Sequence, residues 1–295
     1  MKLVIEGLTK TYKNGVKAID GLNLEIGTGM FGLLGPNGAG KSSLMRTIAT
    51  LQSPDSGSIT FGDINVLEDK MSLRKVLGYL PQSFGVYPKM SAEDLLDYFA
   101  TLKGISSKSD RKKIVTKVLE ITNLYEVRKK HVAGYSGGMK QRFGIAQLLL
   151  NNPKLIIVDE PTAGLDPAER HRFLNVLREV GTNCTVIFST HIVEDVKELC
   201  KEMAILNGGR ILKHTTPMEA TKEIEGKIWV KVIKRDDLES IEATFNVLSS
   251  NYNQDNTLNV RVFSNEKPAE DFVSTEPQLD DVYFIALKDD QPVTA

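Results

Sequence analysis

A glycine-rich segment, residues 35–42, carries the most definite chemical pattern in this sequence. It reads Gly-Pro-Asn-Gly-Ala-Gly-Lys-Ser, which fits G-x-x-x-x-G-K-[ST] between a strand-like run and a helix-forming run. The glycines let successive backbone N–H groups face a phosphate chain, and the following helix adds its positive end. Lys41 would reach the β- and γ-phosphates, and the Ser42 hydroxyl would bind Mg²⁺. A glycine-rich turn that binds nothing is the alternative. The predicted nucleotide-binding residues are Gly35, Pro36, Asn37, Gly38, Ala39, Gly40, Lys41, Ser42 and Ser43.

Two acids follow a fully apolar run in Leu155-Ile-Ile-Val-Asp-Glu160. Buried parallel strands deliver side chains to their carboxyl edge, which is where open parallel sheets bind ligands. Asp159 would belong to the Mg²⁺ shell, and Glu160 is placed to orient and polarise an attacking water. A strand that ends in a polar turn is common, so this pattern gains its meaning from the phosphate loop upstream.

A third motif, Tyr135-Ser-Gly-Gly-Met-Lys-Gln-Arg142, opens a helix shortly before the apolar strand. Ser136 would cap this helix while Gly137 and Gly138 expose N–H groups, which predicts a second anion site. Taken alone, the motif could be an ordinary Ser-Gly-Gly helix cap. In this order, the three motifs resemble the phosphate loop (Walker A), the signature motif and the Walker B strand of ATP-binding-cassette (ABC) ATPases.

The resemblance covers residues 2–215 and implies an α/β fold, the P-loop NTPase cassette. That fold has a parallel-sheet core, an antiparallel β part and a helical subdomain. In the ABC family, the signature of one subunit closes over the γ-phosphate held by the other, so the resemblance implies ATP, Mg²⁺ and a dimer, here a homodimer. Tyr135 stands where Leu is usual and Met139 where Gln is usual, which leaves the Ser-Gly-Gly core intact.

Four more positions match motifs of the family in the expected order. Tyr12 resembles the aromatic residue that stacks on adenine, although an exposed tyrosine is its plain alternative. Gln82 resembles the glutamine that touches Mg²⁺ and water next to the transmembrane partner, and otherwise is a solvated loop residue. Asp166 resembles the loop that crosses the dimer interface, and an N-cap before Pro167 is an equally physical role. His191 resembles the switch histidine that contacts the γ-phosphate.

The spacing of apolar residues predicts the elements that position these motifs. Apolar strands alternate with helices, which is typical of a parallel sheet covered on both faces. Residues 91–152 have helical periodicity and predict a helical subdomain. The expected strands are Lys2–Thr9, Lys17–Ile26, Met30–Leu34, Ser58–Phe61, Leu77–Leu80, Leu155–Val158 and Cys184–Ser189, and the expected helices outside the subdomain are Ser42–Leu51, Asp166–Val180 and Ile192–Cys200.

Composition divides the 295 residues into two parts of opposite charge. The whole chain has a net charge of −1 and is 41% apolar, which is typical of a folded soluble protein and excludes disorder and wholesale nucleic-acid binding. Residues 221–295 carry 8 basic and 15 acidic side chains and only one of the 23 glycines, whereas residues 1–220 are net positive. We therefore expect an ATPase domain at 1–220 and a small acidic α+β domain at 221–295.

The C-terminal segment has its own predicted pattern of elements. We expect a strand over Lys227–Ile233, a helix over Asp237–Ser249, a strand over Leu258–Phe263 and a short apolar end, Val282–Leu287. Regulation, dimer stabilisation and docking of a partner all remain open as roles for this segment. An acidic, solvated domain that only improves packing at the dimer is a further alternative.

Cysteine usage and hydropathy bear on where the protein works. Cys184 and Cys200 have no metal-binding spacing, and we interpret them as reduced packing thiols. His131, His171 and His214 match no motif and are expected to be surface or packing residues. No apolar run is long enough to span a bilayer, so a partner would have to supply any membrane part.

These features predict an ATP-hydrolysing motor subunit of an ABC transporter. It would sit peripherally at the cytoplasmic face of the cell membrane, dimerise around two Mg·ATP and drive a separate transmembrane permease subunit, with no nucleic-acid partner. Residues 84–103 and the tail motif Pro277–Tyr283 resemble exporter subunits. A soluble ABC ATPase acting on ribosomes or DNA is the main alternative, and a P-loop kinase or GTPase would lack the signature and the histidine.

Overall fold

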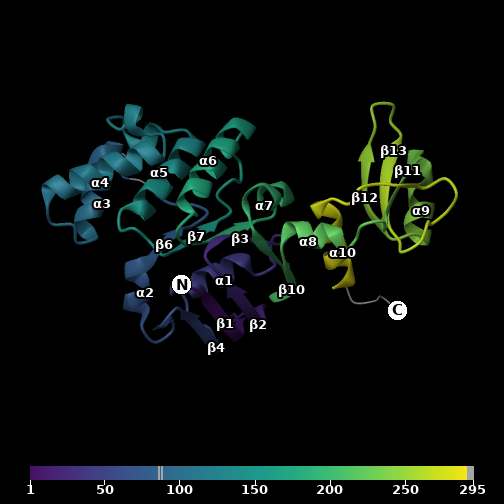
Figure 1. The fold of residues 1–295 in the computed structure, drawn as a ribbon, viewed down its shortest axis with the longest axis horizontal. Coiled ribbons are helices and arrows are strands. Elements are labelled where there is room, and N and C mark those ends of the chain that lie inside the picture. The colour runs from purple at the N-terminus through teal and green to yellow at the C-terminus, as the bar shows by residue number, and fades with distance from the viewer. Residues whose placement is uncertain (86, 88, 291–295) are drawn as a thin grey trace.

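The computed structural model describes residues 1–85, 87 and 89–290, and a six-stranded sheet forms its centre (Figure 1). The strands lie in the order β10-β9-β3-β8-β7-β6; the five from β9 to β6 run parallel, and β10 adds an antiparallel edge. This arrangement confirms the predicted parallel core. The strands are β3 (Gly29–Leu34), β6 (Leu77–Leu80), β7 (Leu155–Asp159), β8 (Thr185–Thr190), β9 (Glu202–Asn207) and β10 (Arg210–Thr215).

Both faces of the central sheet are buried. Successive side chains of a strand point to opposite faces, so the continuous apolar runs of these parallel strands need a cover on each side. On one face, Val158 and Phe188 belong to the same apolar cluster as buried residues of α5, α6 and α7. On the other face, Leu33 and Ile187 pack with α1 and with a second sheet. These helices are α1 (Lys41–Ile48), α5 (Gly137–Leu149), α6 (Pro167–Val180) and α7 (Val193–Leu199).

The second sheet is antiparallel and has the order β2-β1-β4-β5. Its strands alternate buried apolar and exposed residues, as in β2, where Leu22, Leu24 and Ile26 are buried. This pattern is typical of a sheet with one solvated face. The sheet is the antiparallel part that the family resemblance implies, and its strands are β1 (Leu3–Thr11), β2 (Lys17–Ile26), β4 (Ser56–Phe61) and β5 (Ile64–Asn65).

The helical segment predicted at residues 91–152 contains α3 (Ala92–Leu102), α4 (Lys108–Ile121) and α5. Two short 3₁₀ turns, Tyr125–Val127 and Val132–Gly134, lead into α5. Serine hydroxyls cap all three α-helices by accepting a backbone hydrogen bond, and the helices share a separate apolar cluster. Within the described part of the chain, no helix combines the length and hydropathy that a bilayer-spanning helix needs.

Residues 1–222 are called the body here. Besides β9 and β10, three elements of the body were not predicted from the sequence. They are α2 (Lys70–Val76), which Asp69 caps, the two-residue strand β5, and α8 (Pro217–Lys222). Both helices are short, and each buries a single residue, Leu73 in α2 and Ala220 in α8. A helix that buries so little shows no 3.6-residue apolar period, which is why the sequence pattern did not reveal it.

The C-terminal segment forms a four-stranded antiparallel sheet, β12-β13-β11-β14, that shares an apolar cluster with α9. The prediction of one helix over Asp237–Ser249 is wrong in its second half, because α9 ends at Thr244 and a strand begins at Val247. Ser249, Ser250 and Asn251 are poor helix formers, and they pair with β13 instead. The elements are β11 (Ile228–Ile233), α9 (Leu238–Thr244), β12 (Val247–Tyr252), β13 (Leu258–Phe263) and β14 (Val273–Ser274).

The chain then returns to the body through α10 (Leu279–Asp289), where the sequence predicted only a short apolar end (Figure 1). This helix contacts α7, α8, β9 and β10. Leu279, Val282 and Tyr283 lie in the same buried cluster as Val196 of α7 and Ile205 of β9. The C-terminal segment is therefore joined to the central sheet by a packed helix as well as by the connection after α8.

Both cysteines lie as buried free thiols, as predicted for packing residues. Burial raises the pKa of the Cys184 thiol to about 11, and burial likewise raises the pKa of the Cys200 thiol far above its ordinary value. A thiolate is the reactive form of cysteine, so neither residue is suited to redox or nucleophilic chemistry.

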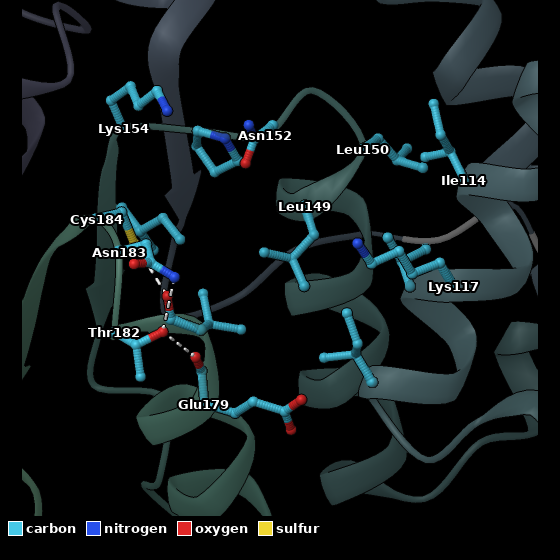
Figure 2. A pocket seen from close by; sticks show the side chains of 15 residues that line it. Ile114, Lys117, Leu149, Leu150, Asn152, Lys154, Glu179, Thr182, Asn183 and Cys184 are labelled. Carbon is cyan, nitrogen blue, oxygen red and sulfur yellow. Dashed lines mark hydrogen bonds between the residues drawn. The ribbon is translucent and has the colours of Figure 1, made fainter.

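An open pocket of about 770 Å³ lies between the helical segment and the central sheet (Figure 2). Lys117 of α4 and Glu179 of α6 line it, together with Lys154 and Cys184, which precede β7 and β8. The pocket is therefore at the amino ends of the parallel strands. Because ligands of parallel sheets bind at the carboxyl ends, this pocket is not the predicted nucleotide site.

Replacing Phe188 by alanine tests the central core. The side chain is fully buried in β8, so its loss should lower the free energy of unfolding by about 3–5 kcal/mol. Val232→Ala is a control on β11, where the side chain is 61% exposed, and should change the unfolding free energy by less than about 1 kcal/mol. Urea unfolding followed by circular dichroism measures both values, and equal destabilisation would contradict the core assignment.

Candidate nucleotide site

The glycine-rich segment 35–42 connects the carboxyl end of β3 to α1, as predicted. Gly38 and Gly40 have φ angles of +84° and +109°, a region that disfavours other residues. A Cβ atom at Gly40 would also lie 2.2 Å from the carbonyl oxygen of Ala18. The backbone can therefore form this tight loop only with glycine at position 40.

Lys41 is buried at the start of α1, and its ammonium group contacts two backbone carbonyl oxygens and one carboxylate. Nζ donates to the carbonyl oxygens of Gly35 at 2.6 Å and Pro36 at 3.0 Å. It also lies 3.2 Å from Oε1 of Glu160. A buried cation needs such partners, and anionic phosphate oxygens could replace the carboxylate among them.

The carboxylate of Glu160 contacts the three other residues that the sequence predicted as catalytic. Besides Lys41 at Oε1, its Oε2 accepts from Nε2 of Gln82 at 3.4 Å and lies 3.5 Å from Nδ1 of His191. Glu160 follows β7, Gln82 follows β6, and His191 follows β8, so all three leave neighbouring parallel strands at the same edge. The predicted catalytic residues thus form one cluster.

Glu160 itself has a strained backbone that a neighbour on β8 supports. Its φ angle is +46°, which costs a non-glycine residue on the order of 1 kcal/mol. The Glu160 N–H donates to the carbonyl oxygen of Ser189 at 3.2 Å and to its Oγ at 3.0 Å. The same Ser189 hydroxyl lies 2.6 Å from Oδ1 of Asp159, to which it donates its hydrogen. Ser189 therefore orients both acids, a role that the sequence analysis missed.

The candidate metal ligands are all oxygen donors of the kind that Mg²⁺ prefers. Asp159 contributes a buried carboxylate, and Ser42 contributes a half-buried hydroxyl on the first turn of α1. Gln82 uses its amide nitrogen toward Glu160, so its amide oxygen is the atom that could bind a metal. The negative charge of Asp159 is also felt at Tyr79, whose pKa is raised mainly by burial and further by this carboxylate. This donor set fits Mg²⁺.

Tyr12 lies beside the phosphate loop rather than free on the surface. Its hydroxyl is 3.0 Å from Oγ of Ser43 and donates to Oε1 of Gln52 at 3.1 Å. Gln52 in turn donates to the Ser43 carbonyl oxygen and to Thr47. This network places the half-buried aromatic ring next to the start of α1, a position compatible with the predicted contact to a base.

The signature residues are not part of the Glu160 cluster. Ser136 caps α5 by accepting from the N–H of Met139 at 3.2 Å, as predicted. A Cβ atom at Gly138 would lie 2.8 Å from Cβ of Glu169 on α6, an atom that cannot move without its helix, so the close contact of α5 and α6 favours glycine there. In the described ranges of the chain, no hydrogen bond or ion pair links residues 136–138 to residues 35–43.

The two departures from the common signature are accommodated by packing. Tyr135 is buried against Phe143, donates its hydroxyl to the Val127 carbonyl oxygen at 3.0 Å, and has a pKa that burial raises to about 12. Met139 packs on the apolar cluster of the helical segment. Asp166 caps α6, because its Oδ1 accepts from the N–H of Glu169 at 2.9 Å. The N-cap half of its prediction is therefore confirmed.

A buried acid on α7, Asp195, ties the loops of Glu160 and His191 together and was also missed. Its carboxylate accepts from Thr162 at 2.6 Å, from Nε of Arg170 at 2.6 Å and from Thr190 at 3.4 Å. Thr190 also accepts from the N–H of Ile192, next to His191. The sequence did contain one indication of this role. Asp195 lies between Val193 and Val196 on the apolar side of a helix, and an acid in such a place is rarely tolerated unless it has buried partners.

The family model described as ABC transporter matches residues 19–163. The uncharacterised ABC transporter ATP-binding protein YxlF of Bacillus subtilis (strain 168) is 39% identical over 210 residues, which cover 71% of this chain and 69% of that protein. This chain belongs to the ABC transporter ATP-binding proteins. Nod factor export ATP-binding protein I of Rhizobium etli is 35% identical over 222 residues, 74% of this chain and 69% of the relative.

A solved structure agrees with this ABC assignment. The dimeric ATP-binding cassette MJ0796, in a post-hydrolysis state bound to ADP and Pi, matches with a TM-score of 0.65 and 26% identity, covering 72% of this chain and 98% of the other. The predicted α/β P-loop cassette fold is confirmed. As a member of this family, the chain is an ATPase that binds ATP.

Replacing Ser189 by alanine tests the support of the two acids in this ABC ATPase. The substitution removes the hydroxyl's hydrogen bonds to Asp159 and to the Glu160 N–H, but this N–H keeps its bond to the Ser189 carbonyl oxygen. The net loss is therefore about one hydrogen bond, and turnover should fall by about tenfold. The Kd for ATP should stay within about twofold, since the Ser189 side chain makes its hydrogen bonds to Asp159 and Glu160 and none to residues 35–41. Ser250→Ala, at an exposed position of β12, is the matched control, and an unchanged turnover in Ser189→Ala would contradict this role.

Proposed function

We propose that this ABC ATPase is the motor subunit of an exporter, which pairs with a second copy and drives a separate transmembrane permease subunit. The observation that carries the ATP-hydrolysing part of this proposal is the convergence of Lys41, Gln82 and His191 on the Glu160 carboxylate. A buried acid surrounded by these donors, directly after the buried Asp159, is suited to orient a water beside a phosphate chain.

In this proposal the phosphate loop binds ATP through residues 35–43. Lys41 exchanges its contact with Glu160 for the β- and γ-phosphates, which frees the carboxylate to accept a proton from the attacking water. His191 contacts the γ-phosphate from the end of β8. Tyr12 lies against the adenine base. Ser42, Gln82 and Asp159 would hold Mg²⁺, which neutralises charge on the phosphates when it is bound.

The second copy supplies what one subunit lacks. Ser136, Gly137 and Gly138 lie at the start of α5 and would form an anion site there, separate from the Glu160 cluster of the same chain. The signature of one subunit would bind the γ-phosphate held by the other, and Asp166 would lie in the loop between them. Because ATP contacts both subunits only in the closed dimer, its binding shifts the population toward closure. The dimeric state of MJ0796 supports this arrangement.

An exposed apolar surface on the helical segment is the proposed contact with the permease. Tyr98 and Leu102 are four residues apart on α3 and are 43% and 65% exposed. Tyr87, from the segment after Gln82, lies edge-on to Tyr98 with ring centroids 6.3 Å apart. Exposed apolar side chains that gather in this way mark interaction surfaces. We place this face toward the cytoplasmic side of the membrane.

Export rests on resemblance. The segment 84–103 includes Tyr87 and Tyr98, whereas Val86 and Pro88 lie outside the described residues. The tail motif 277–283 forms the start of α10 and the chain before it. The relative from Rhizobium etli is named for export of Nod factor, which supports the direction but not the cargo.

Glu160→Gln tests the proposed general base. The amide keeps the size of the side chain and cannot accept the proton, so ATP binding should persist while turnover falls by at least about 100-fold. An ATP-bound dimer should accumulate, visible by size-exclusion chromatography with light scattering. Glu194→Gln, at an exposed position of α7, is the matched control. Near-normal hydrolysis in Glu160→Gln would refute the assignment.

Tyr98→Glu tests the proposed membrane contact. A charge in an apolar interface should reduce the fraction of protein that sediments with membrane vesicles from its own cells by about tenfold, since burying an unpaired charge costs more than 1.4 kcal/mol. Basal ATPase activity of the purified protein should stay the same, because Tyr98 is not part of the nucleotide site. Tyr252→Glu, at an exposed position of β12, is the control. Equal sedimentation of the two variants would exclude this surface.

A further inference from the structure

The last turn of α10 contacts the turn that joins β9 to β10. Oδ2 of Asp290, the C-cap residue that directly follows α10, accepts from Nδ2 of Asn207 at 2.9 Å. Oδ1 of the same carboxylate accepts from Nη2 of Arg210 at 2.8 Å. The Asp290 side chain is 14% exposed, so this contact is partly shielded from water. One carboxylate thus holds both ends of the turn 207–210.

The same turn lies against the phosphate loop. The N–H of Gly209 donates to the carbonyl oxygen of Ala39 at 2.9 Å, and the Gly209 carbonyl oxygen accepts from the N–H of Asp20 at 3.0 Å. Gly209 has a φ angle of +77°, and a Cβ atom there would lie 2.9 Å from the Ala18 carbonyl oxygen. The turn therefore packs backbone against backbone on the loop that carries Gly40.

The position of Asp290 is not explained by the stability of its own helix. The C-terminus of a helix carries partial negative charge, so a carboxylate there is unfavourable unless donors or cations face it. Lys288, the basic residue of the last turn of α10, donates to the Val247 carbonyl oxygen and to Asn246. The donors that face Asp290 are those of Asn207 and Arg210, which belong to the body.

We propose that Asp290 is a positioning residue of the nucleotide site. By holding Asn207 and Arg210, it fixes the turn whose Gly209 amide supports the Ala39 carbonyl group, and so it keeps residues 36–40 arranged for phosphate. The inference rests on the proposed role of residues 35–43 in binding ATP. It gives the C-terminal segment a function: docking of α10 raises ATP affinity, and by linkage ATP binding stabilises the docked helix.

The experiment compares Asp290→Ala with Asp289→Ala in the whole 295-residue chain. Asp289 is the exposed neighbour on the same helix and serves as the matched control. Asp290→Ala should raise the Kd of a fluorescent ATP analogue by about threefold to tenfold, the range of one or two charge-assisted hydrogen bonds weakened by solvent. Turnover at saturating ATP should stay within about twofold of the control, because Asp290 touches none of the catalytic residues.

Two further readouts separate positioning from general destabilisation. Amide hydrogen exchange of the peptide that contains residues 36–41 should be faster in Asp290→Ala than in Asp289→Ala. Arg210→Ala should also raise the Kd for ATP. The double variant with both Asp290→Ala and Arg210→Ala should have a Kd within about twofold of the higher single-variant Kd, because both changes remove the same contact. If Asp290→Ala folds poorly, Asp290→Asn retains the side-chain volume and one acceptor oxygen and should have an intermediate Kd.

An ATP Kd in Asp290→Ala or Asp290→Asn equal to that of Asp289→Ala would overturn the proposal. So would loss of turnover without loss of affinity. Lys41→Ala is measured in parallel: if it leaves ATP affinity unchanged, the proposed phosphate loop fails and the inference fails with it. If Lys41→Ala abolishes binding while the Asp290 variants do not weaken it, only the role of Asp290 is refuted.

Discussion

The Glu160 carboxylate is the contact on which the arrangement of the nucleotide site depends. It is largely buried, and a buried carboxylate must have donors or cations around it. Lys41, Gln82 and His191 meet this requirement from three separate segments. They can do so because β3, β8, β7 and β6 are adjacent and parallel, so that the loops following them emerge at one edge. In the proposed mechanism, a nucleotide that binds Lys41 would remove this cation from the Glu160 carboxylate at the position where a water is activated.

The support behind this contact is a set of buried polar side chains with mutual partners. Ser189 holds the strained backbone of Glu160 and the side chain of Asp159, and Asp195 joins the loop of Thr162 to the residue before His191. A buried polar group that lacks a partner lowers the stability of the fold, whereas a network in which every group is paired holds its segments rigidly. They commit the loops to one arrangement, which a site that must place a water and a phosphate chain accurately requires.

The C-terminal segment takes part in the same arrangement through one helix. The near-neutral net charge of the chain hides an acidic segment and a positive body. At α10 these parts meet, since apolar side chains of this helix lie in the core cluster of the central sheet and Asp290 faces Asn207 and Arg210. The sheet β12-β13-β11-β14 takes part in this contact, because Ile228 of β11 and Leu248 of β12 lie in the same core cluster. Its other buried side chains form a cluster of their own with α9.

The sequence by itself determined the local chemistry and most of the elements. Residues 35–42, the acids after the apolar strand and the Ser-Gly-Gly cap are contiguous patterns whose predicted function follows from backbone geometry and residue type, and they lie on the predicted elements. The sequence did not reveal the supporting roles of Ser189 and Asp195. It also predicted a helix where β12 begins, within residues 237–249, and did not reveal that α10 returns to the central sheet. Three of these depend on a partner far along the chain: Ser189 on Asp159, Asp195 on Thr162, and α10 on the turn at 207–210, which Asp290 contacts. The strand β12 instead forms a hairpin with the next strand, β13. Tertiary structure decides such features, because a hydrogen bond between distant segments leaves no periodicity in either one.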